Sequence, residues 1–192
     1  IILIKDGYVR DFAMNTVCAA GTGSFLDRQA ERMGIKTSDI GQLALRADMP
    51  ASIAGRCAVF AESDIIHKQQ MGVSIENILA GMCRALVRNY MSNVAKGKRL
   101  EPGFCFQGGV SCNEGIKKAF EEEIGAEITV PEHNTVMGAV GAAIIAGEAT
   151  AKNKSRFKGF DADFDEVHTE EFTCSGCGNS CQVVRLLKGE IQ

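Results

Sequence analysis

The sequence lacks several features that would place it in other classes of protein. It has no tryptophan, and no apolar run approaches the ~20 residues that cross a bilayer. Its first residues do not show the charged and then apolar layout of a secretory signal peptide. No segment repeats with a period of 20 to 50 residues, which argues against a solenoid or propeller. We therefore expect a cytoplasmic protein with no membrane contact.

An excess of basic residues is also missing, since the formal net charge is -3. Nucleic acids and anionic lipids select proteins with a basic face, so we expect no nucleic-acid partner. What the chain does have is an ordinary globular composition, with 45% hydrophobic and 23% charged residues over 192 positions. That length is enough for one core and a small appendage. Because the chain begins with Ile1-Ile2-Leu3-Ile4, inside an apolar run and without Met, we expect it to be an excised piece of a longer protein.

The order of predicted elements indicates an α/β fold. An Asp6-Gly7 turn between apolar runs predicts a hairpin over residues 1–12. Apolar spacing and capping residues predict helices at 24–33, 40–47, 58–71, from Ser74 to near Gly97, between Asn113 and Gly125, and at 136–146, with strands at 103–109 and 127–130. Alternating strands and helices favour parallel pairing, with ligands at the carboxyl ends of the strands. The last helix is mostly Ala and Gly, which suits close packing against a sheet or a ligand.

A change in composition after Gly147 divides the chain into three parts. Residues 1–147 form the α/β unit, and residues 148–169 are a charged linker. Residues 170–192 hold two short strands around Cys174-x-x-Cys177-x-x-x-Cys181, a spacing typical of a metal knuckle for zinc or an iron–sulfur cluster. The fourth ligand is missing locally. Cys105, Cys112, a partner protein or another part of the parent chain remain as sources.

The stretch from Cys18 to Gly23 precedes a helix and contains two glycines. Gly21, Thr22 and Gly23 allow a phosphate to approach bare backbone, where the free N–H groups of a helix start attract negative charge. Tight packing alone explains the same small residues, so the motif by itself is weak. Gly108-Gly109, at the end of a predicted strand, can let an adenosine lie against the backbone, or can form a plain turn.

Cysteine is abundant, with eight residues, and without a secretory signal these are better interpreted as thiols or metal ligands than as disulfides. Cys18 and Cys57 each precede a predicted helix. Two thiolates do not fill the four positions of a 4Fe-4S cluster or a tetrahedral zinc, but a symmetric dimer supplies four. The alternative is that both are buried and inert. Cys83, inside a helix, is expected to be a small buried hydrophobe.

Other polar candidates carry less information. Glu62, with Ser63 beside it, lies one turn into the helix after Cys57, where it can reach a ribose hydroxyl or simply face solvent. The three histidines are isolated from one another and from the cysteine pairs, and we expect them on the surface: His67, His133 and His168.

Several motifs occur together in a recognisable order. They are Asp11-Phe12-Ala13-Met14-Asn15 running into Cys18-Ala-Ala-Gly-Thr-Gly-Ser-Phe-Leu, then Cys57-Ala-Val-Phe-Ala-Glu-Ser, Phe106-Gln-Gly-Gly-Val-Ser-Cys-Asn and Met137-Gly-Ala-Val-Gly-Ala-Ala. In these motifs, over about residues 1–147, the chain resembles the activators of 2-hydroxyacyl-CoA dehydratases and the related ATPase subunits of benzoyl-CoA reductase.

The resemblance implies one lobe of an actin-like (RNase H-like) ATPase fold, with a parallel-containing sheet flanked by helices. It implies ATP or ADP with Mg²⁺, and a homodimer that shares one 4Fe-4S cluster through Cys18 and Cys57. ATP hydrolysis in such proteins drives one low-potential electron into a dehydratase partner. A complete activator also has an N-terminal half and a phosphate-binding hairpin, so this piece is not expected to hydrolyse ATP alone. The tail resembles long fused members, in which a dehydratase-like region follows.

Two other functions remain open from the residues themselves. One is a small-molecule kinase of the same fold, such as an N-acetylhexosamine kinase, in which the cysteines are incidental. The other is a non-catalytic assembly module whose tail binds zinc and whose ATPase remnant is structural. The first predicts a colourless protein, and the second predicts zinc without iron or nucleotide affinity.

Overall fold

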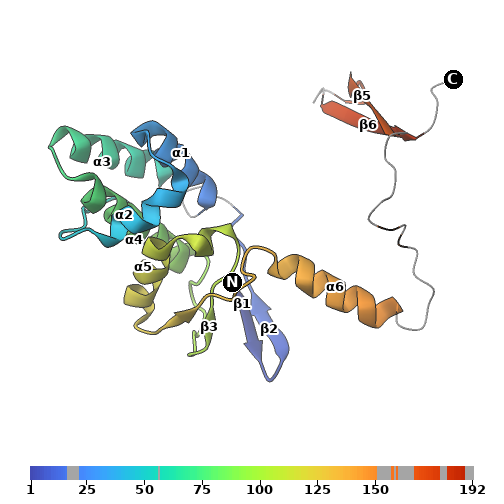
Figure 1. Cartoon of the computed structure of the whole chain (residues 1–192), viewed down its shortest axis with the longest axis horizontal. Coiled ribbons are helices and arrows are strands. Elements are labelled where there is room, and N and C mark those ends of the chain that lie inside the picture. Colours follow the sequence, from blue (N-terminus) through green and yellow to red (C-terminus); the bar gives the residue numbers. More distant parts are fainter. Residues whose placement is uncertain are drawn as a thin grey trace. The chain divides into compact units, whose positions relative to one another are not determined.

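The computed structural model describes residues 1–16, 22–55, 57–150, 157, 159, 167–177 and 181–188. It divides into two compact units, Ile1–Ala143 and Ile144–Gln192, and each is described by itself (Figure 1). Within the described ranges, no helix has the length and apolar character needed to cross a membrane.

A β-hairpin opens the first unit. Strand β1 (Ile2–Lys5) pairs antiparallel with β2 (Tyr8–Phe12). Asp6 and Gly7 both have positive φ, 54° and 78°, as the predicted two-residue turn requires. Lys98 lies 2.5 Å from the Asp11 carboxylate. The hydrogen bond from Lys98 lowers the pKa of Asp11 and ties the hairpin to the segment after the longest helix.

That longest helix, α4 (Ile75–Asn93), is the centre of the core. Ser74 caps it by accepting a hydrogen bond from the Asn77 amide, as predicted. Helices α2 (Ile40–Leu45), α3 (Ala58–Gln70) and α5 (Glu114–Ile124) pack against α4. α1 (Gly23–Met33) contacts the short 3₁₀ turn η2 (Thr37–Asp39), and its buried side chains join the same core. Figure 1 shows these helices gathered in one bundle-like group. The predicted helices are therefore confirmed in type and order.

Helix ends follow the local sequence signals in most places. Gly34 and Gly125 adopt the left-handed conformation, with φ of 66° and 71°, and close α1 and α5 as predicted. Several boundaries differ from the prediction, and α2 ends at Leu45 rather than at Ala47. Helix α4 ends at Asn93, short of Gly97, and the last helix, α6 (Met137–Thr150), continues past Ala146 because Gly147 lies inside the helix and does not adopt the left-handed conformation of a cap.

Strands β3 (Phe104–Cys105) and β4 (Ile128–Thr129) pair in parallel, which confirms the predicted parallel pairing. Both are shorter than predicted. After the Phe106 amide donates to the Thr129 carbonyl at 2.9 Å, the chain turns away into η3 (Gly109–Cys112). The Gly108 amide donates instead to the Asn134 carbonyl at 2.7 Å, and this bond ends the strand geometry.

Helix α6 does not show the close packing that its small residues predict. None of its residues is buried, and Ile144 and Ile145 are 57% and 67% exposed. The boundary between the two units falls within this helix. In the second unit, β5 (Val167–Thr173) and β6 (Gln182–Lys188) form an antiparallel hairpin that pairs over its full length.

Candidate functional site

The structure brings two glycine segments together that are far apart in the sequence. A Cβ placed on Gly23, the first residue of α1, would lie 3.2 Å from Cγ2 of Val110 in η3. The start of α1 therefore lies directly against the turn that begins with Gly108 and Gly109. Gly21 and Cys18, in the same motif as Gly23, lie outside the described residues.

The two glycines of that turn have different reasons to be glycine. Gly108 has φ of 94°, a conformation that other residues rarely adopt. Gly109 has no such backbone, and no described atom lies within 4 Å of where its Cβ would be. Nothing in the described fold thus demands glycine at position 109. An open backbone at this point suits the close approach of a ligand, and the adenosine role of the turn stays a prediction.

Two residues that sequence reasoning missed support the glycine turn. The Ser111 hydroxyl donates to the Gly108 carbonyl at 2.6 Å, and Asn134 Nδ2 donates to the Ser111 hydroxyl at 2.6 Å. Ser111 is only 4% exposed. Together with the Gly108 amide bond to Asn134, these contacts close a small polar network around the turn. In the sequence, Ser111 lies in the motif that begins at Phe106 and Asn134 lies in a polar loop, but neither position reveals that the two residues are partners.

Thr22 caps α1 with extended backbone, and its side chain does not bond to the helix N–H groups. Its hydroxyl instead lies 2.7 Å from the hydroxyl of Ser24. The first N–H groups of α1 therefore donate no hydrogen bond to the side chain at the N-cap, and a phosphate oxygen is a good acceptor for such groups.

Cys57 occupies the N-cap position of α3, with extended backbone (φ -137°, ψ 129°) and a partly buried side chain. Its carbonyl accepts from the Ala61 amide at 2.9 Å and starts the helix. A thiolate at this position experiences the positive end of the helix dipole. Because Cys18 lies outside the described residues, the predicted pairing of the two cysteines stays a prediction.

The loop that leads to Cys57 lies tightly on α4. The Ala51 amide donates to the Asn77 carbonyl at 2.8 Å. A Cβ on Gly81 would lie 2.1 Å from the Ala51 carbonyl oxygen, and a Cβ on Gly55 would lie 2.8 Å from the Ala85 carbonyl oxygen. Small residues on one face of α4 therefore let the loop backbone touch the helix backbone.

Polar contacts hold the same loop at two adjacent residues in its middle, Ile53 and Ala54. Arg88 on α4 donates to the Ile53 carbonyl at 2.7 Å, and the Ala54 amide donates to the Asp64 carboxylate of α3 at 2.8 Å. Ile53 itself is 2% exposed and belongs to the core. The position of Cys57 is thus set by contacts to α4 and α3, none of which the spacing of cysteines reveals.

Apolar side chains are exposed immediately after Cys57. Val59 and Phe60, in the first turn of α3, are 68% and 66% exposed. Both lie within one helical turn of the thiol. Exposed apolar groups next to a partly buried cysteine fit a surface that another protein chain covers.

Glu62 makes contacts that its position in the sequence does not predict. Its carboxylate forms ion pairs with Arg32 and, at 3.7 Å, with Arg28, so it links α3 to α1. The Glu62 side chain is 24% exposed. Pairs with this much solvent contribute at most about 1 kcal/mol each. The ion pairs connect the two helices whose starts carry the predicted nucleotide and cluster residues.

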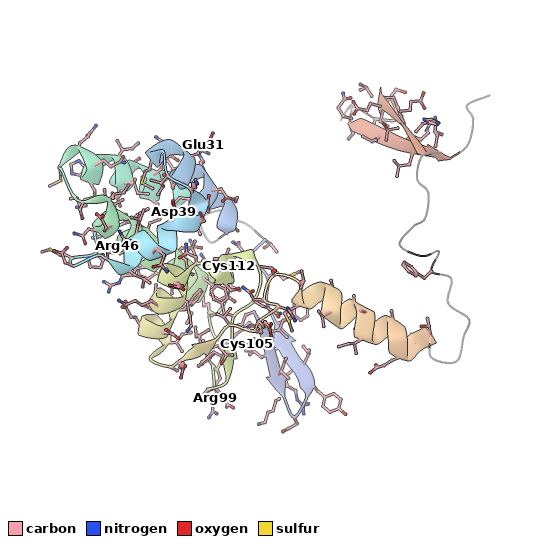
Figure 2. The ribbon with its side chains drawn as sticks, viewed as in Figure 1. Glu31, Asp39, Arg46, Arg99, Cys105 and Cys112 are labelled. Carbon is pink, nitrogen blue, oxygen red and sulfur yellow. The ribbon has the colours of Figure 1, made fainter. Side chains whose placement is uncertain are left out.

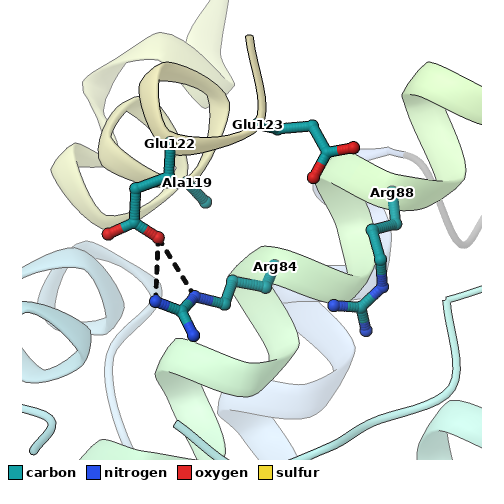
Figure 3. Close-up of a pocket in the computed structure, with 5 residues that line it drawn as sticks. All are labelled: Arg84, Arg88, Ala119, Glu122 and Glu123. Atoms are coloured by element: carbon teal, nitrogen blue, oxygen red, sulfur yellow. Dashed lines mark hydrogen bonds and ion pairs between the residues drawn. The ribbon is translucent and has the colours of Figure 1, made fainter. Parts of the chain in front are cut away.

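Two open cavities lie along α4. One, of about 240 Å³, is bordered by Arg84, Arg88, Ala119, Glu122 and Glu123 (Figure 3), where Arg84 donates from two nitrogens to the Glu122 carboxylate at 2.9 and 3.1 Å. The other, of about 690 Å³, reaches Gly55 in the loop before Cys57. None of the predicted nucleotide residues that the structure describes borders either cavity; four of these five residues are half-buried, and Gly109 is exposed.

The remaining cysteines and the histidines of the described chain differ in burial. Cys83 is 1% exposed, and burial raises the pKa of its thiol to about 12, which confirms it as an inert core residue. Cys105 and Cys112, labelled in Figure 2, are exposed. The three histidines are exposed, as predicted. In the described part of the chain, no three His, Cys, Asp or Glu side chains are gathered closely enough to hold a metal ion.

The sequence of this chain is similar to those of several known proteins. The model of the BadF/BadG/BcrA/BcrD ATPase family matches residues 1–146. A 2-hydroxyisocaproyl-CoA dehydratase activator from Clostridioides difficile is 34% identical over 156 residues, 81% of this chain and 58% of the relative. An (R)-2-hydroxyglutaryl-CoA dehydratase activating ATPase from Acidaminococcus fermentans is 35% identical over 152 residues, 79% of this chain and 58% of the relative.

A solved structure is similar as well. The activator of 2-hydroxyisocaproyl-CoA dehydratase from Clostridium difficile, with bound ADPNP, superposes with a TM-score of 0.72 at 34% identity and covers 81% of this chain and 59% of that structure. The chain thus spans a little over half the length of the proteins that it matches.

Proposed function

This chain belongs to the BadF/BadG/BcrA/BcrD ATPase family, and from that premise we propose that it is one lobe of an ATP-dependent activator that donates single electrons to a CoA-ester dehydratase or reductase. The partner is a separate protein or a domain fused to the same parent chain. The observation that carries this proposal is the contact between the start of α1 and the glycine turn of η3, through Gly23 and Val110. It brings two nucleotide-type motifs side by side in a chain that also holds Cys57 at a helix start.

The nucleotide, ATP or ADP with Mg²⁺, would bind at this contact. Thr22 and Gly23 lie at the positive end of α1, where N–H groups attract phosphate. Gly108 and Gly109 leave the backbone open for the adenosine, and Ser111 and Asn134 hold that turn in shape. Gly21, outside the described residues, would extend the phosphate surface. The ADPNP bound by the similar activator structure supports a nucleotide at this fold.

A 4Fe-4S cluster would be held by Cys57 and Cys18 of two copies of the chain, and it would supply the electron. The residues around Cys57 fit this group. The thiol lies at a helix start whose dipole stabilises negative sulfur, and the exposed Val59 and Phe60 beside it suit burial against a second subunit. A shared cluster also explains how a chain that contributes two cysteines to the cluster meets a requirement for four thiolates.

Coupling between nucleotide and electron transfer would pass through the two helix starts. Glu62 on α3 pairs with Arg28 and Arg32 on α1, so a shift of α1 on nucleotide binding pulls on the helix that Cys57 caps. The contacts between α4 and the loop before Cys57 restrain the movement of that loop. Glu62 therefore acts here as a link between the sites rather than as a ribose ligand.

The decisive experiment is anaerobic. The chain would be purified or reconstituted without oxygen, and iron, sulfide, solution mass and ADP binding would be measured for the wild type, Cys57→Ser and, as a matched control, Cys105→Ser, since Cys105 is exposed and outside the predicted cluster. We expect iron, sulfide and a dimer in the wild type and control, and their loss in Cys57→Ser with ADP binding retained. A wild type that binds ADP but holds no iron would support the kinase alternative instead.

A further inference from the structure

The second unit carries a feature that the family match, which ends at residue 146, does not reach. Its β5–β6 hairpin places three cysteines at one end: Cys174 directly after β5, Cys181 directly before β6, and Cys177 in the bend between them. The ladder pairs Thr173 with Gln182, and the Cys174 amide donates to the Cys181 carbonyl at 2.8 Å. Cys174 and Cys181 therefore face each other across the hairpin as the next pair.

Opposed residues of an antiparallel pair have Cβ atoms about 5 Å apart and side chains on the same face. Two sulfur ligands of one tetrahedral metal are about 3.8 Å apart, because each lies about 2.3 Å from the metal, and the Cβ–Sγ bonds can span the difference. The ladder thus holds the first and third cysteines at a spacing that a metal ion can bridge with small side-chain rotations. Cys177, the second cysteine, needs only to turn its side chain toward the other two.

A second observation points to sulfur as a ligand. The Gly176 amide donates to Cys174 Sγ at 3.4 Å, so the bend already supplies a hydrogen-bond donor to one sulfur. Backbone N–H groups directed at sulfur stabilise the ionised form that binds metals. The cysteines of the hairpin are free in this structure, with no disulfide between them.

The hairpin also has little else to hold it together. Val184 and Leu186 are 58% and 70% exposed. Its other described contacts are surface pairs, such as Arg185 with Glu170 at 3.3 Å and Arg185 over the Phe172 ring at 4.8 Å. An isolated two-stranded hairpin is marginal in water, and units of this size are usually stabilised by a metal, a disulfide or a partner.

We propose that the hairpin tip binds one zinc ion through Cys174, Cys177 and Cys181, with water or a partner side chain in the fourth position. Binding displaces three thiol protons and leaves the zinc oxidation state unchanged. Metal binding would gather side chains that the described structure leaves apart, so part of the binding free energy is used to bring them together. The site is independent of the cluster and nucleotide residues of the first unit.

The test uses the full chain, reduced and free of oxygen, with Zn²⁺ measured by chelator competition and Co²⁺ as a spectroscopic probe of thiolate ligation. Serine variants at Cys174, Cys177 and Cys181 are compared with Cys57→Ser, which replaces a cysteine of the first unit. We expect the tail variants to bind zinc about 100-fold more weakly or worse, and the control to bind as the wild type does. Zinc should also slow hydrogen exchange of the Cys174 amide at least tenfold in the wild type.

The outcomes are distinct. Zinc affinity that is unchanged in the tail variants, or no zinc binding by the wild type, overturns the proposal. If iron and sulfide are lost when the tail cysteines are replaced, the tail holds an iron–sulfur cluster, and the zinc assignment is refuted. Loss of iron in Cys57→Ser with tail zinc intact separates this site from the proposed function, since either can fail without the other.

Discussion

Replacing Gly81 by alanine tests how the loop before Cys57 is positioned. The new Cβ would lie 2.1 Å from the Ala51 carbonyl oxygen, 2.9 Å from the Ala51 carbonyl carbon and 3.2 Å from the Ala51 amide nitrogen. A comfortable carbon–oxygen contact is about 3.3 Å, so the loop or the helix must move by roughly 1 Å. The atoms in the way are backbone and cannot rotate aside. This movement would stretch the bond from the Ala51 amide to the Asn77 carbonyl.

Two opposing effects set the magnitude. Overpacking of this kind costs about 1–3 kcal/mol, whereas alanine in place of glycine in a helix gains up to about 1 kcal/mol. We therefore expect a net loss of about 1–2 kcal/mol in the free energy of unfolding. For a chain of this length, that corresponds to a fall in Tm of roughly 2–8 °C.

Urea unfolding followed by circular dichroism measures the stability, and hydrogen exchange of the Ala51 amide measures the local displacement. Gly141→Ala is the matched control, because Gly141 lies within helix α6 and no described atom comes within 4 Å of its Cβ position. The control should leave stability unchanged or slightly raised. Equal behaviour of the two variants, or a Gly81→Ala protein as stable as the wild type, would refute the close contact between loop and helix.

Three other contacts lead to predictions of their own. Gly109→Ala should weaken ADP binding about tenfold while the unfolding free energy stays within about 0.5 kcal/mol, as measured by calorimetry and urea unfolding; a loss of stability instead would show that the fold needs this glycine. Cys83 should resist alkylation at pH 8 in the native protein while Cys105 reacts, read by peptide mass spectrometry, because burial raises the pKa of Cys83 to about 12; rapid native labelling of Cys83 would contradict this burial. The amide of Ile128 lowers the pKa of Glu121, so the stability from this bond is present above the ordinary pKa of glutamate and lost as pH falls through the lowered value. In Glu121→Gln, the free energy of unfolding should fall less at acid pH than in the wild type, by a difference of less than about 1 kcal/mol. An unchanged pH dependence of that free energy would show that the bond contributes nothing.

The candidate site is only partly predictable from the sequence. Residues near a helix start or a strand end carry local signals, so the sequence indicates Gly23, Cys57 and Gly108 as candidates. It does not indicate Asn134 or Arg88, because their roles depend on a carbonyl or hydroxyl that distant segments bring to them. For Glu62 the sequence does not reveal Arg28 and Arg32 as partners, since only the packing of α3 beside α1 places them next to it.

Local geometry in this protein follows from the amino-acid sequence without help from distant residues. The Asp6-Gly7 turn, the Ser74 and Asn113 caps and the left-handed Gly34 and Gly125 each depend on a few neighbouring residues, so their conformations result from nearby side-chain chemistry.

Which of these local pieces meet is a property of the tertiary fold. The contact of Gly23 with Val110, and the requirement for glycine at position 81, arise where backbones that are distant in sequence touch. The exposed apolar surface of α6 is likewise a tertiary property, because its residues suit burial and nothing in the described structure buries them. Local propensities cannot encode such contacts, since they depend on the whole core closing around α4.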